Sequence, residues 1–159
     1  MKEEFKLPLI KFGKFFGFVI LIFSIILSLS FFSEKKIEEG FREGAGKLLE
    51  LYNSQNGTNL VLSQDPGSFV RSENITLKAE DGTGSVFHIL TFSDNNGYLG
   101  PVLPGILYPG DYTGMKDLEF LGFLGLDDGN NRDIKSEVVC SYYIKKAWDI
   151  LKREDSGEQ

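Results

Sequence analysis

The chain contains one histidine and one cysteine, so His88 and Cys140 are its single candidate Cys–His nucleophile pair. Cys140 falls in an apolar stripe with helical spacing, where a free cysteine behaves as a small hydrophobic residue. His88 falls in the middle of a predicted strand, between Phe87 and Ile89, rather than at a strand end or in a loop. We therefore expect structural roles for both residues, no catalytic residue and no enzymatic activity.

The segment 127–133 is the best candidate for a metal site, because its Asp and Asn residues offer the oxygen ligands that Ca²⁺ prefers. Its order departs from the EF-hand pattern, since Gly129 occupies the third position and no Glu closes the loop. Residues of these types also favour a turn ahead of a helix, and we predict no metal site. The sequence lacks phosphate-loop, dinucleotide-binding, zinc-protease and serine-hydrolase motifs, so we expect no cofactor.

Charge and cysteine content exclude two further classes of function. The chain carries 17 Lys and Arg against 23 Asp and Glu, a net charge of −6, whereas nucleic-acid binding depends on clustered basic side chains. We therefore predict no nucleic-acid partner. A single cysteine also excludes an internal disulfide framework and a cysteine-rich zinc site. Tyr98, Tyr108 and Tyr112 fall in a Gly- and Pro-rich stretch typical of binding loops, although ordinary packing would use them equally.

The most informative segment is an uncharged run of 18 residues, 15–32, with the sequence FFGFVILIFSIILSLSFF. As a helix it would be about 27 Å long, close to the hydrocarbon thickness of a bilayer. We predict a transmembrane helix that acts as a retained signal anchor, preceded by a basic tail at residues 1–14. Lys and Arg residues nearly balance across its two ends. The short tail then favours a cytoplasmic N-terminus with the remaining domain outside the membrane.

Two alternatives to a simple anchor remain open at this level. Ser28-Leu29-Ser30 has the small-x-small pattern of a signal-peptide cleavage site, and cleavage there would release a secreted domain. The order of an apolar helix, an amphipathic helix and a small sheet resembles type IV pilins and related archaeal pilins over residues 1–92. That resemblance implies a filament subunit processed after Gly13 or Gly17, although Ile22 stands where bacterial pilins carry Glu.

Small residues gather on one face of the predicted membrane helix. Gly13, Gly17, Ser24 and Ser28 fall within about 60° of one another at helical spacing, and such faces allow a second helix to approach closely. The expected partners are therefore the membrane and either another transmembrane helix or a second copy of the chain. Two sequons, with acceptors Asn56 and Asn74, would suit an extracytoplasmic domain.

The remaining sequence predicts an α+β fold. We expect a juxtamembrane amphipathic helix at 33–56, a small α+β domain at 57–153 and a frayed tail at 154–159. The domain would contain a small antiparallel sheet built on a hairpin through 75–79 and 86–92, with its second strand covered on both faces. The segment 115–126 reads as a short helix or an irregular apolar patch. A C-terminal amphipathic helix, capped by Asp133, would pack on the sheet through Cys140, Tyr143, Ile144, Ala147, Trp148 and Leu151.

These patterns favour a single-pass membrane protein whose small extracytoplasmic domain acts as a binding or assembly subunit. The pilin-like filament subunit and the secreted domain are the alternatives.

Overall fold

The computed structural model describes residues 6–65, 67–95, 101–126, 129–131 and 135–156, with side chains from residue 15 onward. Its contacts divide the chain into two units, Met1–Glu39 and Gly40–Gln159. The layout is α+β, as predicted, with a long N-terminal apolar helix, an open antiparallel sheet and a C-terminal helix.

Helix α1 (Lys6–Asn56) contains 51 residues and includes both the predicted membrane segment and the predicted amphipathic helix. Pro8 lies in its first turn, where a missing N–H disrupts no hydrogen bond. The helix ends before Gly57, which has a φ of +65°. The Asn53 side chain then fixes the exit of the chain, since its amide donates to Leu60 O and its Oδ1 accepts from Leu60 N.

The sheet contains β1 (Val61–Leu62), β2 (Phe69–Arg71), β3 (Ile75–Glu80), β4 (Val86–Thr91), β5 (Pro104–Pro109) and β6 (Glu119–Phe123). All pairings are antiparallel, in the order β1-β3-β4-β5-β6, with β2 beside β1 on the same edge of β3. The predicted hairpin is β3–β4, and its turn is held by the Asp81 carboxylate, which accepts from the backbone N–H groups of Thr83 and Ser85. The central position predicted for the second strand is confirmed, because β4 lies between β3 and β5.

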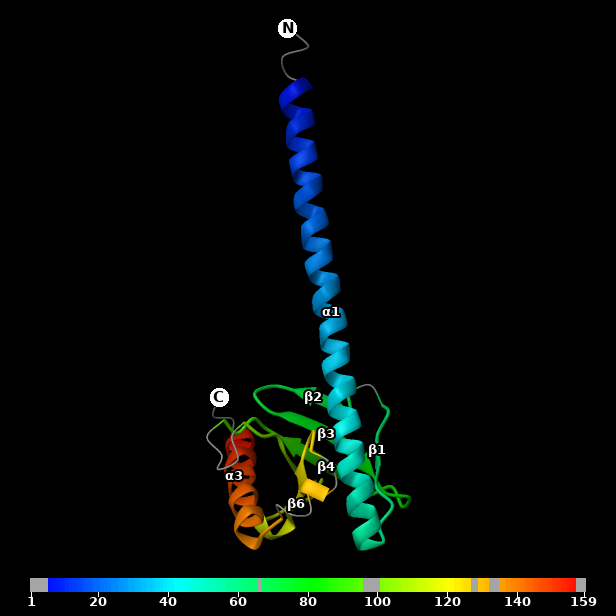
Figure 1. Cartoon of the computed structure of the whole chain (residues 1–159), viewed down its shortest axis with the longest axis vertical. Coiled ribbons are helices and arrows are strands. Elements are labelled where there is room, and N and C mark those ends of the chain that lie inside the picture. The colour runs from blue at the N-terminus through cyan, green and yellow to red at the C-terminus, as the bar shows by residue number, and fades with distance from the viewer. Residues whose placement is uncertain (1–5, 66, 96–100, 127–128, 132–134, 157–159) are drawn as a thin grey trace. The chain divides into compact units, whose positions relative to one another are not determined.

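Two hydrophobic clusters cover the two faces of this sheet. On one face the second part of α1 packs through Ala45, Leu48 and Leu49 against apolar residues of β3, β4, β5 and β6. On the other face helix α3 (Glu137–Ser156) packs through Tyr143, Ala147, Ile150 and Leu151. Figure 1 shows the sheet between these two helices. The domain from Gly40 onward is therefore a three-layer α/β/α arrangement.

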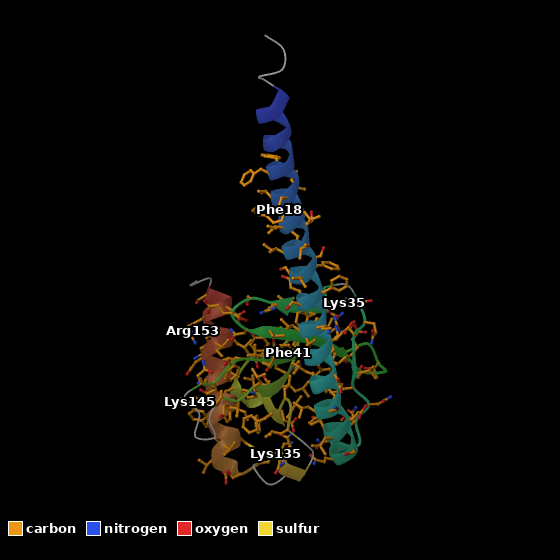
Figure 2. The ribbon with its side chains drawn as sticks, turned by 45° about the horizontal axis from the view of Figure 1, so that its top comes forward. Phe18, Lys35, Phe41, Lys135, Lys145 and Arg153 are labelled. Atoms are coloured by element: carbon orange, nitrogen blue, oxygen red, sulfur yellow. The ribbon has the colours of Figure 1, made fainter. Side chains whose placement is uncertain are left out.

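The predicted stripe of α3 is confirmed, since all six of its residues belong to the cluster on this face or pack against it. Lys145 and Arg153 lie on its exposed outer side (Figure 2). Asp133, the predicted cap, lies outside the described residues. Ser136 caps the helix instead, because its Oγ accepts from Val139 N and its carbonyl accepts from Cys140 N. The helix extends to Ser156, into the segment expected to fray.

The short helix considered for 115–126 is wrong. Only Met115–Asp117 forms a turn of 3-10 helix (η1), and the following residues form β6, the strand that pairs with β5. Gly122 has a φ of +136°, a backbone conformation that excludes an α-helix and that side-chain-bearing residues rarely adopt. Pairing with a neighbouring strand therefore overrides the helical spacing of the apolar residues in this segment.

Candidate functional site

The apolar segment of α1 is exposed along its length. The large hydrophobic side chains from Phe15 to Phe32 are almost all exposed, from 39% at Ile22 to 68% at Phe31. Figure 2 shows side chains projecting from several sides of the helix around Phe18. Among the described residues, α1 is the one helix long and apolar enough to cross a membrane, with a mean hydropathy of 2.6 in its most apolar window.

Three of the four residues predicted to pack against another helix, Gly17, Ser24 and Ser28, lie in this segment. The position of Gly17 is open, because a Cβ there would meet no atom within 4 Å. Ser24 Oγ donates to Ile20 O at 2.9 Å, and Ser28 Oγ donates to Ser24 O at 2.8 Å. These hydroxyls are satisfied within their own helix, which removes much of the cost of placing them in an apolar environment. Gly13 lies in α1, and its surroundings are outside the described part.

His88 and Cys140 have the surroundings of structural residues. The imidazole stacks on the ring of Tyr108, with 5.3 Å between ring centroids, and burial followed by the charge of Lys78 lowers its pKa. Cys140 packs against the hydrophobic cluster between α3 and the sheet, and burial raises the pKa of its thiol. A reactive cysteine needs a lowered pKa. Burial has the opposite effect on Cys140, because it disfavours the charged thiolate.

The oxygen-rich turn can be assessed only at its described positions, since Asp127, Asp128, Arg132 and Asp133 lie outside them. Asn131 is almost fully buried and its amide is used by the backbone: Oδ1 accepts from Phe123 N at 2.7 Å, and Nδ2 donates to the carbonyls of Phe123 and Leu126. Within the described residues, no group of three or more His, Cys, Asp or Glu could hold a metal ion. Asn131 therefore braces the turn after β6, a role that composition alone did not reveal.

The tyrosines considered for a binding loop divide between two environments. Tyr98 lies outside the described residues. Tyr108 lies in β5 and is only 6% exposed, and Tyr112 packs edge-on against both Tyr108 and Trp148. The Tyr112 hydroxyl donates to Asp155 at 2.7 Å, which ties the end of α3 to the segment that follows β5. Tyr108 and Tyr112 therefore serve the packing of α3.

An open face remains on the α3 side of the sheet, at the edge formed by β1, β2 and β3. The pairing registers place seven side chains on it: Val61, Val70, Thr76, Lys78, Glu80, Val86 and His88. Val61 and Val70 are 61% and 56% exposed, and Lys78 Nζ lies 2.8 Å from Glu80 Oε1. Sequence reasoning missed this surface because β1 and β2 are too short to show a period, although the alternation in β3 marked one side of it.

A cleft of about 370 Å³ opens at the same edge, between β1 and the β3–β4 turn. Its lining includes Asp65, Glu80 and Asp81. Two of these carboxylates already have partners within the domain, since Glu80 pairs with Lys78 and Asp81 binds the β3–β4 turn. The cleft therefore has less acidic character than its composition implies.

The fold and these surfaces define the class of protein as a small α+β domain joined to an apolar helix. No protein-family model, curated protein or solved structure matches the chain. The function is therefore inferred from the residues described above.

Proposed function

We propose that this chain is a single-pass membrane protein, anchored by residues 15–32, with an extracytoplasmic domain that acts as a non-catalytic binding or assembly subunit. The observation that supports this proposal most strongly is the exposed apolar segment of α1. Fourteen of its 18 residues are Phe, Leu, Ile or Val. At about −0.3 to −0.6 kcal/mol each, these residues would favour insertion by roughly 4–8 kcal/mol. Leaving the same side chains in water would expose a continuous apolar surface, which soluble proteins avoid.

Two features of the sequence support the orientation. The residues before the segment include Lys2, Lys6, Lys11 and Lys14, and basic residues beside a membrane helix favour the cytoplasmic side. Both sequons, at Asn56 and Asn74, follow the segment. Both features fit a cytoplasmic N-terminus and an extracytoplasmic domain.

The binding or assembly role rests on surfaces rather than on a catalytic constellation. The small-residue face of α1 offers close approach to a second membrane helix. The open face of the sheet combines exposed valines with an ion pair, a mixture of apolar and polar groups found at protein interfaces. The surroundings of His88 and Cys140 favour packing over chemistry, which supports a non-catalytic role.

A filament subunit is the second candidate, and one structural observation favours it. A single helix, α1, supplies both the exposed apolar segment and one wall of the domain. This matches the layout of pilins, in which processing would occur after Gly13 or Gly17. The mature N-terminus separates the candidates, because a retained anchor keeps the whole basic tail, whereas a processed filament subunit lacks residues 1–13 or 1–17.

The orientation can be tested with thiol labelling in a background in which Cys140 is replaced by Ser. A membrane-impermeant maleimide is applied to intact cells that express either Gln55→Cys or Lys2→Cys. Gln55 is exposed at the end of α1, whereas Lys2 belongs to the basic tail. We expect labelling of Gln55→Cys in intact cells and of Lys2→Cys only after permeabilisation. The reverse pattern would place the domain in the cytoplasm and overturn the proposed orientation.

A further inference from the structure

The two sequons of the domain have unlike surroundings. Asn56-Gly57-Thr58 follows directly from the last residue of α1, whereas Asn74-Ile75-Thr76 leads into β3. Transfer of a glycan requires both the Asn amide and the Thr hydroxyl to leave the protein surface and enter an enzyme. The accessibility of the whole triplet therefore decides which sequon can be used by a folded chain.

The first sequon is presented to solvent. Asn56, Gly57 and Thr58 are all exposed. The Asn56 amide donates to Tyr52 O, one helical turn back, and a Cβ on Gly57 would meet no atom within 4 Å. Thr58 Oγ1 donates to Asn53 Oδ1 at 2.7 Å, a single exposed hydrogen bond. Fraying of the last turn of α1 is enough to free this triplet, and helix ends open at little cost.

The second sequon is held by the fold. The Asn74 amide donates to Glu154 Oε1 of α3 at 3.2 Å, and Thr76 pairs with Val70 of β2 on one side and Leu90 of β4 on the other. Releasing this triplet requires the first residues of β3 to separate from both β2 and β4, which costs more than the fraying of a helix end.

We propose that Asn56 is the N-glycan acceptor of this protein and that Asn74 is not modified in the folded domain. In a cell this modification rests on the extracytoplasmic placement proposed above. The donor class is a lipid-linked oligosaccharide pyrophosphate. The Asn56 Nδ2 forms a bond to the sugar C1, the bond from C1 to the pyrophosphate oxygen breaks, the amide loses a proton and the lipid pyrophosphate leaves. No oxidation or reduction is involved.

The test uses the purified full chain in detergent, incubated with an N-oligosaccharyltransferase and its lipid-linked oligosaccharide, and read by intact mass and peptide mapping. Thr83→Asn is the control for enzyme competence, because it completes a sequon with Gly84 and Ser85 in the exposed β3–β4 turn. Two peptides, spanning residues 52–62 and 70–80, are the control for the chemical competence of both native sequons. Asn56→Gln and Asn74→Gln assign the mass increment.

We expect the folded chain to be modified at Asn56 at least about tenfold more than at Asn74, with no such preference between the two peptides. The increment should vanish in Asn56→Gln and persist in Asn74→Gln. Equal modification of both sites in the folded chain, or an unmodified Asn56 alongside a modified Thr83→Asn reporter, would overturn the proposal. Because this assay involves no membrane orientation, its failure would leave the thiol-labelling test of orientation unaffected.

Discussion

Leu48 of α1 packs directly onto Gly105 of β5: a Cβ at Gly105 would lie 2.9 Å from Leu48 Cδ1. Gly105 pairs across the sheet with Gly122 of β6, where a Cβ would lie 3.1 Å from Leu48 Cδ2. Two glycines side by side therefore leave space on the sheet for one leucine, which is only 3% exposed. This contact brings α1 close to the sheet and sets how the helix packs on it.

Replacement of Gly105 by Ala should destabilise the domain, because the new methyl group overlaps a buried leucine at the helix–sheet contact. We expect a loss of about 1–3 kcal/mol, typical of an overpacked core. The free energy of unfolding can be measured for the full chain in detergent by urea titration, followed through the single tryptophan, Trp148. Gly82→Ala is the matched control, since a Cβ there meets nothing within 4 Å. Equal effects of the two substitutions would contradict the proposed contact.

Asn131→Ala should also destabilise the domain, by about 1–3 kcal/mol, because it leaves buried backbone groups without their partners. The side chain makes hydrogen bonds to the N–H and C=O of Phe123 and to the carbonyl of Leu126. Asn59→Ala, at an exposed position, provides the control. The free energies of unfolding are compared by urea titration followed through Trp148 fluorescence. An unchanged stability in Asn131→Ala would show that the turn after β6 does not depend on these hydrogen bonds.

The ion pair between Lys146 and Asp94 links α3 to the segment that follows β4. Lys146 Nζ lies 2.7 Å from Asp94 Oδ1, and the Asp94 side chain is 1% exposed, whereas that of Lys146 is 36% exposed. Loss of the cation should therefore cost about 1–3 kcal/mol, less than for a fully buried pair. A double-mutant cycle with Lys146→Gln and Asp94→Asn measures the coupling, and purely additive effects would exclude a direct contribution of the pair.

The stability of the domain should fall as the pH decreases through the usual pKa of histidine, 6.5. Burial, followed by the charge of Lys78, lowers the pKa of His88 in the folded chain. The unfolded chain therefore binds a proton at a higher pH than the folded chain, so stability is full above 6.5 and lost below it. Unfolding free energies at about pH 7.5 and about pH 5.5 should differ less in His88→Gln than in the original chain. An unchanged difference would show that other groups cause the acid sensitivity.

Periodicity in the sequence was sufficient to predict the longer elements, in which the spacing of apolar residues continues over several turns or several strand positions. The apolar spacing of α3 and the alternation in β3 and β4 span enough residues to reveal which side faces the core. The short strands β1 and β2 offer no such period, so the open face was not predicted. The strand β6 was also missed, because the spacing of its apolar residues fits a helix and only pairing with β5 distinguishes the two.

In the candidate site, too, features defined by local spacing were predictable and features defined by long-range contacts were not. The sequence indicated the small-residue face of α1 and both sequons, because local spacing alone defines them. It could not indicate that Asn131 turns inward to bind the chain after β6, or that Thr76 is paired on both sides. Both facts depend on contacts between segments far apart in the chain.

The most direct test of the central claim is the behaviour of the native protein during alkaline carbonate extraction of membranes, with intact mass measured on the fraction that contains it. We expect the full-length chain in the membrane pellet. A variant with Ile22→Arg and Ile25→Arg should move to the soluble fraction, because each charge at the centre of the segment costs about 2.5–3.5 kcal/mol. Recovery of the unaltered chain in the soluble fraction, or of a chain that begins after Ser30, would contradict the retained membrane anchor.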